Sequence, residues 1–196
     1  MLRTIILILI SLISLNTIAQ NSIIERVNNY LDRKNAFTDE VIYVSIKKQK
    51  LYHIEHDSII KEYIISSSAF GIGNVSGSNK TPIGLHSIKE KYGEKTPING
   101  KMTGREFHGN IATIYTDQTK SKTDDVTSRI LWLEGLEKGK NTGEGIDSFK
   151  RYIYIHGTSE EGRLGKPASH GCIRMKNKEV IDLYKLVEVG TLVLIL

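Results

Sequence analysis

Apolar and polar residues alternate with a period of two in short segments from Glu40 onward, and this pattern constrains the fold most strongly. The side chains of a strand point alternately to its two faces, so such a segment is expected to form a half-buried strand. The mature chain is therefore predicted to be mainly β. The expected strands cover residues 41–47, 50–55, 58–66, 85–89, 110–116, 129–135, 151–156 and 191–196.

Two segments have the spacing of an amphipathic helix instead. Residues 22–33 repeat apolar side chains at Ile23, Val27 and Leu31, and residues 177–187 do so after Asn177, the expected N-cap. Two long polar loops, 66–84 and 137–150, join the predicted strands. Long loops on a compact scaffold often carry functional sites.

The first residues have the layout of a secretory signal peptide. Arg3 gives a positive start, residues 5–15 are apolar apart from two serines, and Thr17-Ile18-Ala19 offers small residues for cleavage. A bilayer span needs about 20 apolar residues, more than this run provides. We therefore expect residues 1–19 to be removed, residues 20–38 to form a helix and lead-in, and no stable membrane span to remain after cleavage. The protein would be exported to the periplasm or cell envelope.

Size and charge narrow the class of protein further. A chain of 196 residues suits one domain with its own core, and we expect it to be a monomer. It carries 27 basic and 22 acidic residues, a formal net charge of +5. The basic residues are interleaved with acids, which disfavours a nucleic-acid partner. A mildly basic protein suits a polyanionic surface such as a cell wall, without requiring one.

Cys172 is the single cysteine of the chain, so it cannot form an intramolecular disulfide. It lies close in sequence to His170, and the predicted strand 151–156 ends at His156. If Ile153 and Ile155 face the core, His156 faces the other way, toward a potential cleft. A free cysteine is mostly protonated at neutral pH, and a nearby imidazole can activate it as a nucleophile.

The neighbours of Cys172 suggest further roles. The N–H groups of Gly171 and Cys172 could bind the oxyanion that forms when the thiolate attacks a carbonyl. Arg174 could hold a substrate carboxylate in a bidentate pair. Each residue also has an ordinary reading, in which Cys172 is a buried filler, His156 bonds a carbonyl, and Arg174 belongs to a surface ion pair.

A zinc site is the alternative chemistry. His156, His170 and Cys172 would supply three ligands, and a fourth would come from one of the other histidines, His53, His56, His86 or His108. No short ligand motif supports this reading. We therefore expect no metal and no cofactor.

Two motifs resemble the L,D-transpeptidase catalytic-domain family, the cysteine enzymes that remodel bacterial peptidoglycan. The first is His156-Gly157 followed by Ser169-His170-Gly171-Cys172-Ile173-Arg174-Met175, and the second is Lys80-Thr81-Pro82-Ile83-Gly84. The resemblance extends from about residue 41 to the C-terminus and implies a catalytic domain over residues 39–196. It also implies a mainly antiparallel fold of two facing sheets with a few short helices.

The resemblance implies a role for each matched residue. Cys172 would be the nucleophile, His156 the proton acceptor and donor, and Gly171 with Cys172 the oxyanion donors. We expect Arg174, Ser169, His170, Gly157 and Thr158 to contact the substrate. Three departures stand out, namely His86 where the family often has an aromatic residue, the 137–150 insertion, and the lack of a recognisable peptidoglycan-binding module before the domain.

The resemblance implies an exported L,D-transpeptidase that acts on the tetrapeptide stems of peptidoglycan. Its thiolate would release the terminal D-Ala and pass the thioester to an amine acceptor. With water as the acceptor, the same site would be an L,D-carboxypeptidase. A cell-wall cysteine endopeptidase is disfavoured because papain-type enzymes place the cysteine before the histidine. A wall-binding module without activity would be expected to lose the thiol or the base, and this chain keeps both.

Overall fold

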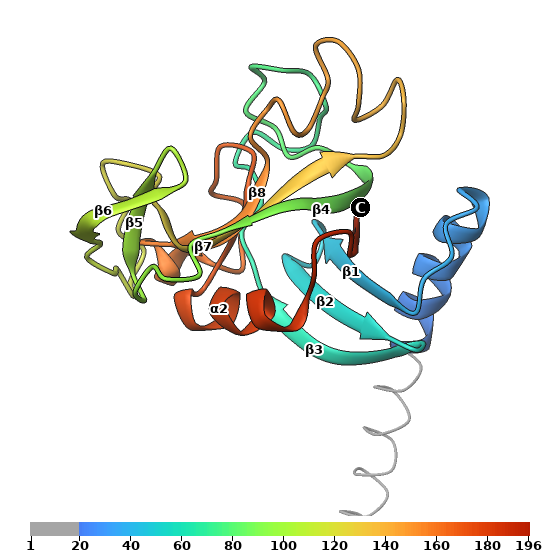
Figure 1. Ribbon diagram of the computed structural model, residues 1–196, viewed down its shortest axis with the longest axis horizontal. Helices are drawn as coiled ribbons and strands as arrows, with labels where there is room; N and C mark the ends of the chain where they lie inside the picture. Colours follow the sequence, from blue (N-terminus) through green and yellow to red (C-terminus); the bar gives the residue numbers. More distant parts are fainter. Residues whose placement is uncertain (1–19) are drawn as a thin grey trace, which may run out of the picture.

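The computed structural model describes residues 20–196, so the expected signal peptide lies outside the described residues. The described chain is mainly β, as expected, and forms a mixed ten-stranded sheet with few helices (Figure 1). The strands are β1 Glu40–Ser45, β2 Lys50–Glu55, β3 Ser58–Ile64, β4 Gly84–Tyr92, β5 Gly100–Thr103, β6 Glu106–Ile111, β7 Val126–Gly135, β8 Tyr154–Thr158, β9 Ile173–Met175 and β10 Leu192–Ile195. The helices after β8 are the 3-10 turn η1, Glu161–Arg163, and α2, Asn177–Leu186.

The strand order departs from two separate antiparallel sheets. A single path runs β3-β2-β1-β10-β4-β7-β5-β6, and β8 and β9 branch from β7. Two neighbouring pairs, β1 with β10 and β8 with β9, are parallel. The sheet folds around one core that takes Ile42 and Leu51 from one half and Leu133 and Ile155 from the other. Opposite halves of the sheet therefore face each other while remaining connected through β10 and β4.

The N-terminal helix, residues 20–33, packs on the outer face of β1 and β2. Its apolar residues Ile23, Val27 and Leu31 are buried against strand residues that include Tyr43 and Tyr52. The helix is also tied to the sheet through Glu137, which accepts a hydrogen bond from Tyr30 and pairs with Lys34. None of the helices in this described part of the chain is long and apolar enough to span a bilayer.

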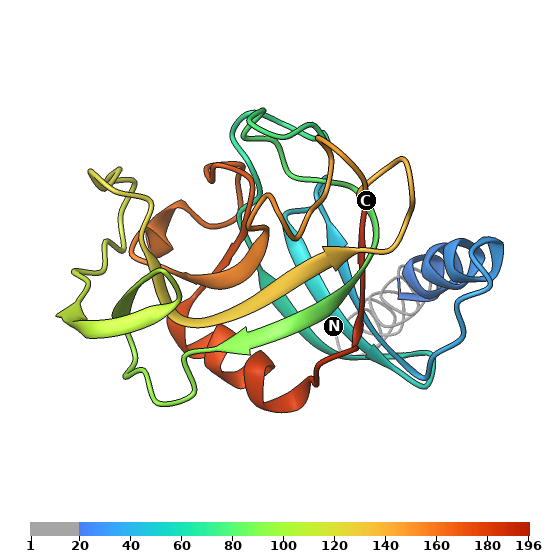
Figure 2. The ribbon, with the colours of Figure 1, turned by 45° about the horizontal axis from the view of Figure 1, so that its top comes forward.

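The alternation of apolar and polar residues does not predict the hairpin of β5 and β6. β5 and β6 form a hairpin at the end of the molecule opposite the N-terminal helix (Figures 1 and 2), and β6 ends at Ile111, well before the end of the strand expected over 110–116. Most residues of β6 are exposed, so they show no apolar alternation. The hairpin turns at Gly104 and Arg105, both with positive φ, as in a two-residue type I′ turn.

Helix α2 covers the core with Val180 and Leu183, and its N-cap is Lys176 instead of the expected Asn177. Asn177 is fully engaged with neighbouring segments: its side-chain oxygen accepts from the hydroxyls of Thr127 and Ser128. Its amide nitrogen donates to the Thr158 carbonyl, 2.9 Å away. The residue that looked like a cap therefore binds α2 to β7 and β8.

Candidate active site

Cys172 and His156 come from two neighbouring parallel strands. Cys172 directly precedes β9, and the register of β8 with β9 pairs Ile155 with Ile173 and His156 with Arg174. Ile153 and Ile155 are buried in the core, as expected. His156 and Cys172 are thereby placed on the opposite face, diagonally across two strands that lie about 4.8 Å apart.

The sulfur of Cys172 is held by the main chain of the segment leading into β8. The thiol donates to the carbonyl of Tyr152, 3.3 Å away, and its sulfur accepts from the N–H of Tyr154 at 3.4 Å. Burial raises the pKa of the thiol to about 12, with the Tyr154 N–H and the charge of Arg151 acting in the opposite direction. The resting sulfur is therefore a neutral thiol at pH 7.

His156 is almost fully buried on β8, with 2% of its surface exposed. Its Nδ1 lies 2.7 Å from the carbonyl oxygen of Gly157. A carbonyl can only accept, so Nδ1 carries the proton and Nε2 of the neutral ring has a free lone pair. Burial lowers the pKa of His156, against the raising effect of the Asp124 charge, so the ring is neutral and able to accept a proton.

The neutral thiol of Cys172 predicts a slow reaction with a simple alkylating agent. At pH 8 a free cysteine with a pKa near 8.5 is about one quarter thiolate, whereas a pKa of about 12 leaves only ~10⁻⁴. The higher basicity of the thiolate recovers part of this loss. We expect iodoacetamide to label Cys172 roughly 10- to 100-fold more slowly than a free cysteine.

The labelling rate should also keep rising with pH through pH 10, because the thiolate fraction grows until the raised pKa of about 12 is reached. Mass spectrometry of samples quenched over time gives this profile, with a cysteine peptide as the reference. A plateau below pH 9 would instead indicate a stabilised thiolate and imidazolium pair.

Ser169 closes the turn that carries the cysteine. Its hydroxyl donates to the carbonyl of Cys172 at 2.6 Å and accepts from the N–H of Gly171 at 3.2 Å. Gly171 has φ of +127°, a conformation that favours glycine. The Gly171 N–H, expected to bind an oxyanion, thus has an internal acceptor in this structure. Its catalytic role stays a prediction.

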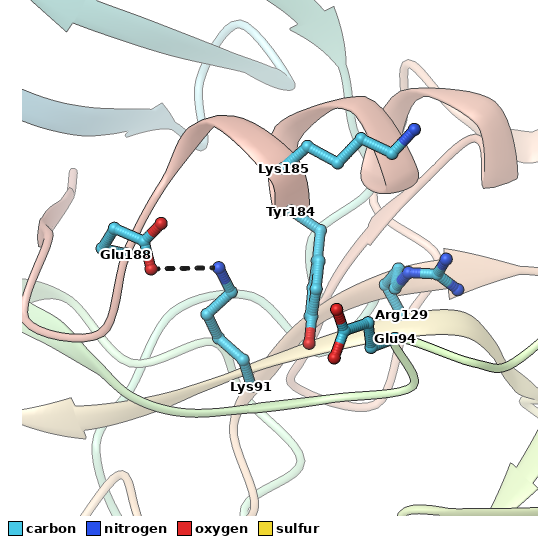
Figure 3. A pocket seen from close by; sticks show the side chains of 6 residues that line it. All are labelled: Lys91, Glu94, Arg129, Tyr184, Lys185 and Glu188. Carbon is cyan, nitrogen blue, oxygen red and sulfur yellow. Dashed lines mark ion pairs between the residues drawn. The ribbon is translucent and has the colours of Figure 1, made fainter.

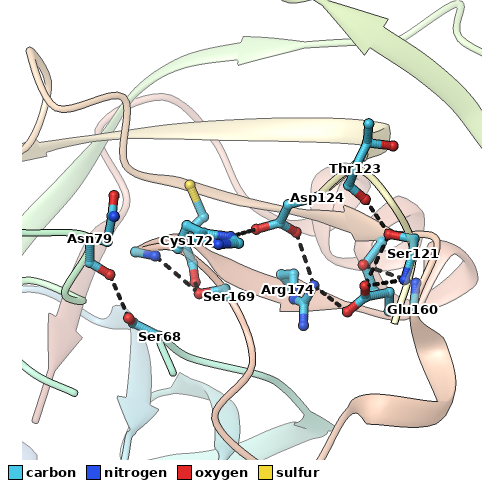
Figure 4. A network of polar contacts seen from close by, with 12 residues as sticks. Ser68, Asn79, Ser121, Thr123, Asp124, Glu160, Ser169, Cys172 and Arg174 are labelled. Carbon is cyan, nitrogen blue, oxygen red and sulfur yellow. Dashed lines mark hydrogen bonds and ion pairs between the residues drawn. The ribbon is translucent and has the colours of Figure 1, made fainter. Parts of the chain in front are cut away.

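Arg174 has a setting different from the expected carboxylate clamp. Its side chain is 1% exposed, and Nη1 pairs with Asp124 and with Glu160, each at 2.9 Å (Figure 4). Asp124 pairs in turn with Nδ1 of His170 at 2.9 Å. Burial raises the pKa of Asp124, but the nearby positive charge, that of Arg174 first, and the hydrogen bonds from His170 and Arg174 together hold that pKa below its usual range. Arg174 therefore joins two internal carboxylates, Asp124 and Glu160, and substrate binding by it stays a prediction.

The other expected contact residues divide by exposure. The side chain of His170 is about half exposed. Ser169 and Thr158 are buried, and Thr158 accepts from the N–H of Glu160. At Gly157 an added Cβ would lie 2.6 Å from the side-chain oxygen of Asn177, so close packing requires glycine there. Of this group, His170 is the side chain that solvent or a ligand can reach most easily.

The loop over residues 66–84 is hydrogen-bonded to residues 169–174, the segment that contains Cys172. Ser66 exchanges main-chain hydrogen bonds with Arg174, and Ala69 donates to the carbonyl of Ser169. The hydroxyl of Thr81, from the Thr-Pro-x-Gly motif, accepts from the N–H of Ser68 at 2.9 Å. The upstream motif thus positions the segment that holds Ser169 to Arg174.

His86 and the 137–150 insertion contribute structure next to the site. His86 is fully buried between the Gly84 carbonyl and the Ser148 hydroxyl, each 3.0 Å from the ring, and burial lowers its pKa to about 4. The main chain of Phe149 accepts from the Trp132 indole N–H at 3.0 Å, and its ring stacks on Trp132 at 4.0 Å. The insertion is therefore packed onto β4 and β7.

An aromatic cluster of Tyr92, Trp132, Phe149, Tyr152 and Tyr154 adjoins the thiol. Trp132 lies at its centre, 5.5 Å from the rings of both Tyr152 and Tyr154. Cys172 packs against this cluster, which also includes buried Met102. The thiol therefore lies between this aromatic cluster and the ion pairs that Arg174 forms with Asp124 and Glu160.

One hollow in the described part of the chain lies apart from the thiol, which is not among its lining residues. It measures about 620 Å³ and lies between α2 and the strands, lined by Lys91, Glu94, Arg129, Tyr184, Lys185 and Glu188 (Figure 3). A smaller hollow of about 170 Å³ includes Asp124, His170 and Arg174 in its lining. The smaller hollow is lined by His170 and Arg174, which are neighbours of Cys172 in the sequence.

The zinc alternative weighed from the sequence would use His156, His170 and Cys172 as ligands. Within residues 20–196, the group whose donor atoms lie within 4.8 Å of one another is Glu40, His53 and Glu55, on β1 and β2. His53 already pairs with Glu40 at 2.7 Å. This group includes none of the three residues suggested from the sequence.

Comparison with known proteins decides the family. A family model described as the L,D-transpeptidase catalytic domain matches residues 39–195 of the chain. This chain belongs to that family. The match covers the motifs around His156 and Cys172 together with the strands that hold them, and it confirms the resemblance read from the sequence.

Individual members of the L,D-transpeptidase family are similar over part of their length. The candidate L,D-transpeptidase YqjB of Bacillus subtilis is 56% identical over 45 residues, 23% of this chain and 26% of that protein. YkuD of the same organism is 50% identical over 46 residues, 24% of this chain and 28% of that protein. The chain thus spans about a quarter of the length of the curated relatives it matches.

Solved structures of the family share the fold. An L,D-transpeptidase of Enterococcus faecium gives a TM-score of 0.50 at 17% identity, covering 82% of this chain and 50% of that one. An L,D-transpeptidase from Mycobacterium smegmatis gives 0.50 at 16% identity, covering 81% and 58%. At these identities the likeness concerns the arrangement of strands and helices.

Several residues near the site cannot be recognised as such from the sequence. Asp124 and Glu160 belong to polar loops and resemble ordinary solvated acids until the fold brings them to Arg174. Trp132 lies in a strand whose nearest neighbours are apolar, so it resembles an ordinary core residue. The tryptophan count of one could have drawn attention to it, but not to its place beside the thiol.

Proposed function

We propose that the protein is an exported L,D-transpeptidase that acts on peptidoglycan tetrapeptide stems through a Cys172 thioester. The observation that carries this proposal is the placement of Cys172 and His156 on one face of adjacent strands, with Nδ1 of His156 bonded to the Gly157 carbonyl. That bond leaves Nε2 available to accept the thiol proton.

The first half-reaction forms the thioester. Nε2 of His156 takes the proton from Cys172 as the sulfur attacks the carbonyl before the terminal D-Ala. The resulting oxyanion collapses, the C–N bond breaks, and the imidazolium gives its proton to the leaving amine. The Cys172 N–H and the Gly171 N–H are the proposed oxyanion donors, and Gly171 would have to exchange its Ser169 partner for the substrate.

The second half-reaction transfers the acyl group. An amine of a neighbouring stem attacks the thioester, His156 accepts its proton, and the thiol is regenerated. If water attacks instead, the product is a trimmed stem and the enzyme is an L,D-carboxypeptidase. Asp124 and Arg174, which surround the catalytic segment, would hold the site in place during both steps.

A single experiment separates these outcomes. The purified protein is incubated with tetrapeptide muropeptides, and the products are identified by mass spectrometry. Transpeptidation gives a cross-linked dimer and free D-Ala, carboxypeptidation gives a tripeptide and free D-Ala, and an endopeptidase cuts elsewhere in the stem. Unchanged muropeptides would contradict the proposed function.

The exported state is tested independently. The signal-like pattern of residues 1–19 predicts cleavage between Ala19 and Gln20. N-terminal sequencing of the protein isolated from its native cell envelope should therefore begin at Gln20. A chain that still began at Met1 would contradict the prediction.

A further inference from the structure

Arg105 lies at the tip of the β5–β6 hairpin and points over the aromatic cluster beside the thiol. Its guanidinium carbon is 4.6 Å from the centre of the Trp132 ring, 5.6 Å from that of Tyr92 and 6.0 Å from that of Tyr152. Interaction with the hydroxyls of Tyr154 and Tyr92 also favours the charged form and raises the pKa of Arg105. Several aromatic side chains therefore fix this cation in one orientation.

The same aromatic residues connect Arg105 to the sulfur. Tyr152 and Tyr154, which contact Arg105 with their side chains, hold Cys172 Sγ through their main-chain carbonyl and N–H. Arg105 is thus separated from the nucleophile by a single layer of side chains. A substrate bound with its reacting carbonyl at Cys172 would extend along this aromatic cluster.

The charge of Arg105 has no internal counter-ion. Within residues 20–196, Arg163 and Arg174 pair with carboxylates, whereas no Asp or Glu forms an ion pair with Arg105. Glu106 and Glu94 line the same shallow hollow as Arg105 but form no ion pair with it. A guanidinium has five N–H donors, so the two tyrosine hydroxyls leave others available for a ligand.

The backbone conformation of Arg105 also favours a functional role for its side chain. Arg105 has φ of +73°, a left-handed conformation that costs free energy for any residue with a side chain. Asparagine or glycine would suit the turn better. The turn nevertheless carries a long cationic side chain, which it directs back over Trp132.

We propose that Arg105 binds a carboxylate of the acyl-donor stem and makes the enzyme selective for donors that carry it. This proposal rests on the proposed function. Two carboxylates of a tetrapeptide stem lie near the scissile bond: the terminal carboxylate of the leaving D-residue, and the side-chain carboxylate of a dicarboxylic diamino acid at the third position. Lysine at the third position lacks the second of these.

Three synthetic tetrapeptides distinguish the two sources. The first has a dicarboxylic diamino acid at the third position and a free terminal carboxylate. The second has lysine at the third position, and the third ends in a carboxamide. Release of the terminal residue is measured for the parent protein, Arg105→Gln and Arg105→Lys. Arg33→Gln is the matched control, because Arg33 also stacks on a tyrosine, Tyr30, but on the N-terminal helix.

We expect the parent to lose roughly 10- to 100-fold in kcat/KM when the recognised carboxylate is removed, the range of a charge-assisted hydrogen bond. The kcat/KM of Arg105→Gln on the first peptide should be lower than that of the parent by the same factor. Removal of the recognised carboxylate should then cause no further change in the kcat/KM of this variant. Arg105→Lys should recover part of the loss, and Arg33→Gln should match the parent. An Arg105→Gln protein that equals the parent, or that loses activity equally on all three peptides, overturns the proposal.

Binding measurements separate this proposal from the proposed function. Calorimetry gives the Kd of each peptide for two proteins, the Cys172→Ser variant and the double variant that also carries Arg105→Gln. Carboxylate-dependent affinity that disappears in the double variant supports the subsite even if the parent protein turns over none of the peptides, a result that would overturn only the proposed function. Binding of the first peptide that is unaffected by Arg105→Gln, or no binding of any peptide, overturns the subsite.

Discussion

Cys172→Ser is expected to form no covalent adduct and to lose muropeptide turnover by about 10³-fold or more. A serine hydroxyl is a far weaker nucleophile at neutral pH than a cysteine thiol. By family resemblance, a carbapenem should add one drug mass to Cys172 of the parent protein and none to the variant. Intact-protein mass spectrometry over a time course gives the rate of adduct formation for the parent and for the variant.

Loss of the fold would not explain that result. The main chain of Tyr152 and Tyr154 holds the thiol, and a serine hydroxyl can make the same contacts. The melting temperature of Cys172→Ser should therefore stay close to that of the parent. A variant that took up the drug as fast as the parent would remove Cys172 from the catalytic role.

His156→Ala is expected to slow acylation about 10²- to 10⁴-fold, the usual contribution of a general base. His156→Gln is the second variant, because its side-chain amide can still donate to the Gly157 carbonyl and fill the buried space. Both variants lack the basic Nε2, so both should be slow. Single-turnover acylation is measured beside a melting curve for each protein.

His170→Ala provides the matched control for this comparison. Its side chain is about half exposed and pairs with Asp124, so its removal should cost less than about 1 kcal/mol of stability and less than about tenfold in rate. A fully folded His156→Gln protein that acylates at the parental rate would show that another group takes the proton.

The sequence predicts the scaffold well where one face of a strand is buried. Ile153 and Ile155 enter the core as the alternation requires, and this places His156 on the other face. The helix of residues 20–33 buries the expected apolar side chains Ile23, Val27 and Leu31. In these elements local pattern and tertiary burial agree, so the prediction and the structure coincide.

Prediction fails where the deciding contacts are distant in sequence. The β5–β6 hairpin buries too little to show a period, and the parallel pairing of β1 with β10 joins the two ends of the described chain, with Val41 opposite Leu192. Arg174 is the clearest case at the site. Its neighbours in sequence give no hint of Asp124, and without that partner a buried arginine beside a nucleophile resembles a substrate ligand.

The pairing of β8 with β9 separates the residues proposed to perform the chemistry from the parts of the molecule that surround them. The proposed base and nucleophile are held by one short crossover and its register, His156 opposite Arg174, whereas the β5–β6 hairpin contributes no residue to that register. Exchanging the hairpin for one of another length or charge would therefore leave the reacting groups in place. Engineering, or natural divergence, could alter which stems the protein accepts by changing the contiguous residues 100–111 at the end of the molecule, without rebuilding its catalytic centre.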